Sequence, residues 1–165
     1  MTSEHLLHTI PPIYDGNSKI LILGSFPSVK SREVSFYYGH PQNRFWRVLA
    51  AVLGCAVPSS NEEKTALLQS HNIALWDIIK SCDIVGSSDS SIKNVVPNDI
   101  GTILSSCGIR QIYSNGKTSE KLFNKYIKDT VGRDTVALPS TSPANASYNL
   151  ERLTDSWSVI KNNIR

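Results

Sequence analysis

The chain has 165 residues, of which 40% are hydrophobic and 19% are charged, and its formal net charge is +3 at pH 7. This length predicts one domain, spanning residues 1–165, with a sizeable core. The mild positive charge permits a nucleic-acid partner without requiring one. The sequence lacks an apolar run long enough for a transmembrane helix, and residues 1–12 lack the pattern of a signal peptide, so we expect no membrane contact.

The three cysteines, Cys55, Cys82 and Cys107, are widely spaced and form no C-x-x-C pair. This spacing argues against a structural zinc site, an iron–sulfur cluster and a disulfide framework. We therefore expect a reduced, cytoplasmic protein that needs no metal and no other cofactor.

Short apolar runs predict four β-strands, at Lys19–Gly24, Ile73–Ile79, Ile109–Tyr113 and Thr135–Leu138. Helical spacing of apolar residues predicts five helices, at Asn43–Leu53, Asn61–His71, Asn98–Ser106, Lys117–Lys128 and Tyr148–Ile164. Asn61 is the expected N-cap of the second helix, and residues 86–91 are expected to form a surface loop. Alternating strands and helices predict an α/β fold, a three-layer α/β/α sandwich around a mostly parallel four-stranded sheet. Residues before 15 are left as an extended segment.

Ligands of such sheets bind beyond the carboxyl ends of the strands, which directs attention to the segments after Gly24, Asp77, Tyr113 and Leu138. The first segment is Gly-Ser-Phe-Pro-Ser, residues 24–28. Its glycine allows a close backbone approach to a ligand, and its hydroxyls can hold a phosphate. An ordinary strand-to-loop exit is the alternative.

Residues 37–46, Tyr-Tyr-Gly-His-Pro-Gln-Asn-Arg-Phe-Trp, form the most unusual stretch. Asn43 is either a helix N-cap or an amide that holds a water or a carbonyl group. Tyr38, upstream of the helix, is a better stacking candidate than Phe45 or Trp46, which we expect in the core. His40 is either a turn residue bonded to the backbone or a ligand contact.

Two later strand exits are also polar. Residues 115–118, Asn-Gly-Lys-Thr, lack the second glycine of a phosphate-binding loop, because Gln111 stands at that position. This departure excludes a P-loop nucleotide triphosphatase. The exit at 138–146 is stiffened by Pro139 and Pro143 and carries three hydroxyls, and a simple connecting loop is the alternative.

Three segments in this order resemble the uracil-DNA glycosylase superfamily, and within it the hypoxanthine-DNA (deoxyinosine) glycosylase branch. They are Gly24–Ser28 as the first motif, Tyr37–Trp46, and Leu138–Ala146 as the second motif, and the resemblance extends over about residues 15–163. In uracil-cleaving branches the third residue of the first motif is a water-activating Asn or Asp, whereas this chain has Phe26 there. The hypoxanthine branch places its catalytic Asn in a Gly-His-Pro-x-Asn stretch, where this chain has Asn43. The resemblance therefore implies hypoxanthine as the base.

The resemblance also implies roles for individual residues. Asn43 positions the water, and the base pocket contains Gly24, Ser25, Phe26, Tyr38, His40 and Asn115. DNA contacts come from Pro27, Ser28, Lys30, Lys117, Ser140, Ser142, Pro143 and Ala144, with residues 142–144 as a wedge into the duplex. The expected partner is double-stranded DNA with a deaminated base, with single strands left open, and the expected enzyme is a monofunctional, monomeric glycosylase.

Three alternatives remain at this point. A uracil or mismatch glycosylase predicts activity on G·U pairs, and Phe26 argues against it. A non-catalytic lesion-binding module predicts affinity without base release, and Asn43 argues against it. A flavodoxin-like nucleotide-binding domain requires a Gly-rich phosphate loop, which the sequence lacks. The role of Asp77 also stays open, between orienting the pocket loops and capping a turn.

Overall fold

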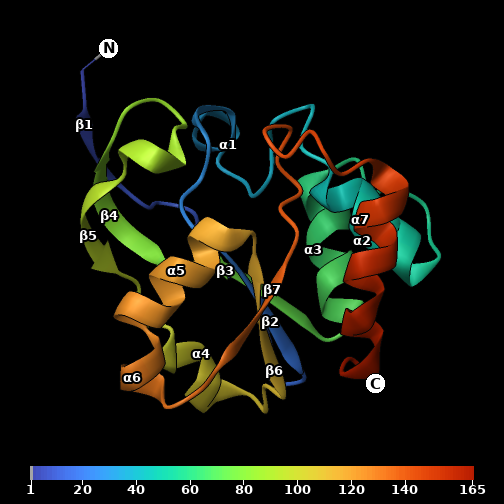
Figure 1. The fold of residues 1–165 in the computed structure, drawn as a ribbon. Helices are drawn as coiled ribbons and strands as arrows, with labels where there is room; N and C mark the ends of the chain where they lie inside the picture. The colour runs from blue at the N-terminus through green and yellow to red at the C-terminus, as the bar shows by residue number, and fades with distance from the viewer. Residues whose placement is uncertain (1) are drawn as a thin grey trace.

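The computed structural model describes residues 2–165, and a four-stranded sheet forms its centre (Figure 1). All four strands are parallel and lie in the order β3-β2-β6-β7, and their bounds are β2 Ile20–Gly24, β3 Ile73–Asp77, β6 Gln111–Asn115 and β7 Thr135–Leu138. The predicted parallel sheet is confirmed. Parallel pairing requires helical crossovers, and these cover both faces of the sheet.

Strand β2 is buried on both faces, and its side chains alternate between two cores. Ile20 and Ile22 belong to the core under α2 (Phe45–Leu53), α3 (Asn61–Ser70) and α7 (Leu150–Trp157). Leu21 and Leu23 belong to the core under α4 (Gly101–Ser106), α5 (Lys117–Tyr126) and α6 (Lys128–Val131). This alternation follows from the two-residue period of a strand and confirms the predicted three layers.

A second, antiparallel sheet stands beside the first and was not predicted. Its order is β1-β4-β5, with β1 Glu4–Leu7, β4 Ile79–Ile84 and β5 Lys93–Pro97. The expected single strand at 73–79 is wrong in its last part, because the chain leaves the parallel sheet at Ile78. The Asn98 side chain stabilises this bend by donating from Nδ2 to the carbonyls of Asp77 and Ile79, at 2.9 and 3.2 Å.

The helix ends differ from the prediction in a few places. Ser60, rather than Asn61, caps α3 and forms a capping box with Glu63. The short helix α1 (Val29–Val34) and the 3-10 turn η1 (Asp89–Ser91) were not predicted, and a second 3-10 turn, η2 (Ser158–Asn162), replaces the end of the last predicted helix. Among residues 2–165, no helix combines the length and apolar character that crossing a membrane requires.

Candidate active site

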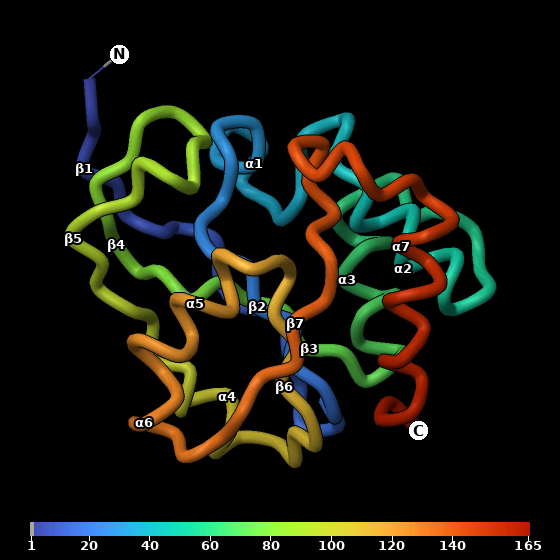
Figure 2. Tube along the Cα trace, viewed as in Figure 1, coloured from blue at the N-terminus to red at the C-terminus, as the bar shows by residue number. Residues whose placement is uncertain are grey.

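The loops at the carboxyl ends of the parallel strands enclose a cavity of about 370 Å³, within the size range of small-molecule sites. Every residue predicted for catalysis or for the base pocket lines it: Gly24, Ser25, Phe26, Tyr38, His40, Asn43 and Asn115. Six predicted DNA contacts line it as well: Pro27, Ser28, Ser140, Ser142, Pro143 and Ala144. Figure 2 shows the loop before α1 and the loop after β7 reaching the same end of the molecule.

Two predicted DNA contacts lie outside the cavity lining. Lys30 is on the exposed side of α1, with its Nζ 3.6 Å from Glu33 Oε2. Lys117 is exposed at the first residue of α5. Neither side chain lines the cavity.

Asn43, Thr141 and Asn115 form one side of the cavity, which we call the Asn43 wall. Asn43 Oδ1 accepts from the Phe45 backbone N–H and from the Thr141 hydroxyl, both at 2.9 Å. The Thr141 hydroxyl accepts from Asn115 Nδ2 at 3.1 Å. The backbone N–H of Thr141 donates to Asn115 Oδ1, also at 3.1 Å. These bonds fix both amide orientations. Asn43 thus turns its oxygen toward the start of α2, which leaves its NH₂ group as the donor available to a ligand.

Arg44 fastens the loop after β7 to the start of α2. Its Nη2 donates to the carbonyls of Ser142 and Asn145 at 2.8 and 3.1 Å, and its Nη1 donates to the carbonyl of Tyr148. Its backbone N–H donates to the Thr141 carbonyl at 3.0 Å. A guanidinium has five donors in a fixed plane, which suits it to holding several loop carbonyls together.

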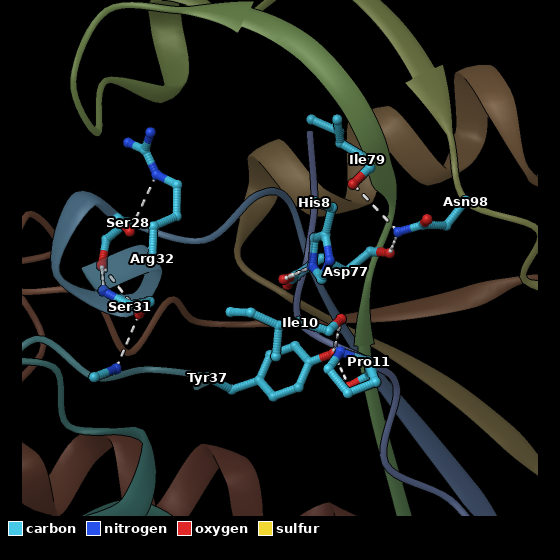
Figure 3. Close-up of polar contacts among 11 residues, drawn as sticks. His8, Ile10, Pro11, Ser28, Ser31, Arg32, Tyr37, Asp77, Ile79 and Asn98 are labelled. Atoms are coloured by element: carbon cyan, nitrogen blue, oxygen red, sulfur yellow. Dashed lines mark hydrogen bonds and ion pairs between the residues drawn. The ribbon is translucent and has the colours of Figure 1, made fainter. Parts of the chain in front are cut away.

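Gly24, Tyr38 and Asp77 form the other side, which we call the Asp77 wall. Asp77 ends β3 directly beside Gly24 in the parallel register. Its Oδ2 accepts from His8 Nε2 at 2.8 Å, and the two side chains are only 5% and 2% exposed (Figure 3). A Cβ atom at position 24 would collide with Asp77 Oδ1 and lie 3.0 Å from the Tyr38 hydroxyl oxygen. Only glycine leaves room for both polar groups here.

The two tyrosines of the Tyr-Tyr-Gly-His-Pro stretch have different surroundings. The Tyr37 hydroxyl donates to the Pro11 carbonyl at 2.8 Å and so ties the N-terminal segment to the core (Figure 3). Tyr38 has a left-handed φ of 53° and stacks on Phe45, with the ring centroids 4.1 Å apart. Its hydroxyl is buried and has no hydrogen-bond partner among the described residues. Burial and the nearby Asp77 charge raise the pKa of Tyr38, and the neighbouring Asn115 side chain opposes this shift, so the hydroxyl stays neutral.

The third residue of the first motif belongs to an apolar cluster. Phe26 packs with Ile79, Cys82 and Ile84, and its ring meets the edge of the His8 ring. An apolar ring offers no acceptor to a water at this position.

Next to Phe26, the Ser25 hydroxyl donates to Asp89 Oδ1 at 3.3 Å. Desolvation and the nearby Asp77 charge raise the pKa of Asp89, while the Ser25 bond opposes this shift. The cavity therefore has an acidic side and a neutral side.

Several predicted phosphate-binding hydroxyls also brace their own loops. Ser28 caps α1 by accepting from the Ser31 backbone N–H at 3.1 Å. Ser140 and Ser142 accept from backbone N–H groups two residues further on, at 3.1 and 3.2 Å. His40 Nδ1 accepts from the Gln42 backbone N–H at 3.0 Å, which is the turn contact that the sequence left as an alternative, and the residue still lines the cavity.

Sequence reasoning missed several residues of this site. Thr141 and Arg44 lie inside the quoted motifs, but their contacts join segments about 98 positions apart. His8 stands alone in the N-terminal segment, and Ser31, Ser87 and Asp89 carry no motif that marks them as cavity residues. Among residues 2–165, no group of three or more His, Cys, Asp and Glu side chains is arranged to hold a metal ion.

Comparisons with known proteins place the chain in a family. The profile of the uracil DNA glycosylase superfamily matches residues 11–162. A protein of Methanosarcina barkeri named hypoxanthine DNA glycosylase is 35% identical over 137 residues, covering 82% of this chain and 85% of its own. One of the same name from Methanosarcina acetivorans is 34% identical over 152 residues, covering 91% and 94%.

A solution NMR structure of a proposed uracil DNA glycosylase from Methanosarcina acetivorans has the same fold. Its TM-score is 0.79 at 32% identity, and the match covers 92% of this chain and 94% of that one. Fold, motifs and relatives together define a DNA glycosylase. The chain belongs to the uracil-DNA glycosylase superfamily, and its substrate is DNA.

Proposed function

We propose that this glycosylase hydrolyses the N-glycosidic bond of hypoxanthine in double-stranded DNA that contains deoxyinosine. The observation that carries the proposal is the pairing of Asn43 and Phe26 in one cavity. Asn43 is fixed with its NH₂ group free of bonds to described residues, and Phe26 fills with an apolar ring the position that uracil-cleaving relatives use for a water-activating residue. The two relatives named hypoxanthine DNA glycosylase support the same substrate.

Base flipping delivers the substrate to the cavity. A glycosidic bond inside a duplex is out of reach, so the nucleotide must leave the stack at a cost of a few kcal/mol. Residues 142–144 form the wedge, and Arg44 holds the backbone of this turn against α2. Lys30, Lys117 and the hydroxyls of Ser28, Ser140 and Ser142 contact flanking phosphates, which positions the DNA without reading its sequence.

Asn43 positions the attacking water. Both lone pairs of Oδ1 are already engaged by Phe45 and Thr141, so the NH₂ group donates to the water oxygen. An amide is a poor base, and positioning therefore contributes more than proton removal. The C–N bond breaks largely before the water attacks, and the purine leaves with the electron pair of that bond, stabilised by hydrogen bonds. The water oxygen then bonds to C1′, and the proton that the water loses passes to the departing purine.

We also propose that the enzyme is monofunctional and monomeric and acts where the cell keeps its DNA. The part of the cavity lining that the structure describes contains Ser, Asn, Tyr and Asp side chains but no lysine amine for a Schiff base. Tyr38 is the proposed stacking residue for the base, with Phe45 supporting the other face of its ring.

Base release from two matched duplexes tests the substrate. One duplex carries a single deoxyinosine and the other a single deoxyuridine, and alkali converts the abasic sites to strand breaks. We expect release mainly from deoxyinosine. Release mainly from deoxyuridine would overturn the choice of base, and binding without release from either would favour a lesion-binding module.

A further inference from the structure

A buried carboxylate forms part of the cavity, and no step of the proposed reaction uses it. Asp77 is 4% exposed and comes from the carboxyl end of β3. Its backbone carbonyl is held by Asn98 and its Oδ2 by His8. Burying a carboxylate is costly unless its hydrogen bonds are made. A carboxyl group braced from two sides in a ligand cavity is therefore a candidate for a specific contact.

The two carboxylate oxygens have different surroundings. His8 Nε2 donates to Oδ2 at 2.8 Å, while no hydrogen bond joins Oδ1 to another residue in the range 2–165. Oδ1 faces the space above Gly24, where a single methyl group would collide with it. Asp77 thus offers the cavity one fixed acceptor and no donor.

The neighbouring Tyr38 hydroxyl does not serve as a second contact. It lies near the same space above Gly24, but it is buried, and the Tyr38 ring is the part assigned to the base. The Asp77 wall therefore presents one unmatched acceptor, Asp77 Oδ1, to a ligand.

This pattern complements one purine edge better than the others. Hypoxanthine presents the N1–H donor next to the O6 acceptor, whereas adenine presents an N1 acceptor next to an amino donor. Guanine shares N1–H and O6 but adds a 2-amino group. Because His8 occupies Oδ2, Asp77 has no second acceptor for that group, and a polar group left without a partner in a ligand site is disfavoured.

We infer that Asp77 is the specificity-determining residue of this glycosylase: its Oδ1 accepts from N1–H of the flipped hypoxanthine. His8 is a positioning residue that holds the carboxylate. Reading a flipped base at its Watson–Crick edge is chemically sufficient to separate hypoxanthine from adenine. This inference rests on the proposed function, because it deepens the choice of base.

The test measures single-turnover excision from duplexes with deoxyinosine or 1-deaza-deoxyinosine, in which C–H replaces N1–H and the ring proton moves to N3 or O6, so that no N–H faces Asp77. Rates of enzyme-free acid hydrolysis correct for the different leaving groups. The wild-type enzyme should lose about 10- to 100-fold in rate on the deaza substrate, as expected for a hydrogen bond to a charged group. This arm needs no variant, so it stands even if a substitution at Asp77 prevents folding.

Asp77→Asn supplies the second arm. His8 retains its bond to the amide oxygen, so the cavity receives an NH₂ donor in place of the acceptor. The variant should excise deoxyinosine about 10- to 100-fold more slowly, treat the two substrates nearly alike, and lose selectivity against deoxyadenosine. Asp83→Asn is the matched control, because Asp83 also pairs with a histidine, His5 at 2.7 Å, but does not line the cavity.

The outcomes separate the two proposals. If the wild-type enzyme does not release hypoxanthine, the proposed function fails. If it does release hypoxanthine but excises both substrates at equal corrected rates, or if Asp77→Asn retains the wild-type ratio between them, the assignment of Asp77 is wrong while the proposed function stands.

Discussion

The two walls of the cavity differ in how far their hydrogen bonds are completed in the free protein. On the Asn43 wall, the side chains of Asn43, Thr141 and Asn115 bond to one another and to the start of α2. On the Asp77 wall, the Tyr38 hydroxyl is buried without a partner and Asp77 Oδ1 faces the cavity. Asp77 ends β3 and Asn115 ends β6, and these two strands are the neighbours of β2 in the sheet.

This difference suggests a division of labour. A completed network holds a group in one place, which is what a water-positioning amide needs. Unmatched polar atoms instead gain hydrogen bonds only when a ligand supplies the partner, which is what base recognition needs. Substitutions in one wall, or at a residue outside both walls, should separate these two roles, and the largest expected effect comes from the Asn43 wall.

Thr141→Val opens the network of the Asn43 wall while keeping the shape of the side chain. The buried hydroxyl that links Asn43 to Asn115 is lost, so each amide keeps only one of its bonds, Asn43 Oδ1 to the Phe45 N–H and Asn115 Oδ1 to the N–H of residue 141, and is held less firmly. We expect excision of deoxyinosine to fall about 100-fold, as for a misplacement of about 1 Å, and the free energy of unfolding to fall by about 1–3 kcal/mol. Single-turnover kinetics and thermal denaturation measure the two effects. Thr141→Ser is the control, and a normal rate for the valine variant would contradict the role of the network.

Gly24→Ala places a methyl group on the Asp77 wall. The new Cβ collides with Asp77 Oδ1 and crowds the Tyr38 hydroxyl, so one of the two must move. We expect a loss of about 1–3 kcal/mol in stability and about a 10-fold loss in excision, measured by denaturation and single-turnover assays. Gly108→Ala is the matched control, since a Cβ there meets no atom within 4 Å. Full activity in the Gly24 variant would show that the base does not use this space.

Lys117→Gln tests a residue outside both walls. If Lys117 neutralises one phosphate, the slope of log affinity against log salt should fall by about one unit, equally for DNA with and without deoxyinosine. Fluorescence anisotropy at several salt concentrations measures this slope. The same change at Lys30 should act in the same direction but less, because Glu33 already lies near its amine. An unchanged slope for Lys117→Gln would remove it from the DNA contacts.

Asp89→Asn reduces the charge on the acidic side of the cavity. The folded-state pKa of Asp89 is raised, so its ionised form opposes folding above that pKa and the effect vanishes below the unfolded pKa of about 3.9. The variant should be slightly more stable than the wild type at pH 7, and the difference should shrink toward pH 4. Thermal denaturation across this range checks the sign. Lower stability of the variant at pH 7 would contradict the raised pKa.

The central fold follows from patterns that the sequence carries locally. A strand such as Ile20–Gly24 is apolar on both faces, and helices follow at regular intervals, so the parallel sheet could be predicted. The second sheet could not, because β1 pairs with β4 across 80 positions, from Glu4 to Ile84, and β4 pairs with β5 through irregular registers. The bend at Ile78 depends on Asn98, which lies in a later segment.

In the candidate site, too, the positions of residues could be predicted from local patterns, whereas their long-range contacts could not. Residues at strand ends, such as Gly24 and Asn115, were predicted because the carboxyl ends of parallel strands meet at one edge. The contacts that orient them were not predicted, since Thr141 bonds to Asn43 across 98 positions and His8 bonds to Asp77 across 69. Proximity to a motif in the sequence can also mislead. Lys30 follows the first motif closely, but its side chain lies near Glu33 and does not line the cavity.

The most direct test of the account replaces the NH₂ group of Asn43 while retaining its oxygen. Asn43→Asp preserves the bonds from Phe45 and Thr141, whereas Asn43→Ala removes them. Single-turnover excision of deoxyinosine at saturating enzyme should fall about 10²- to 10³-fold in both variants, with DNA binding retained and only the alanine variant losing stability, by about 1 kcal/mol. A near-normal rate for Asn43→Asp would show that the oxygen, and not the NH₂ group, acts on the water.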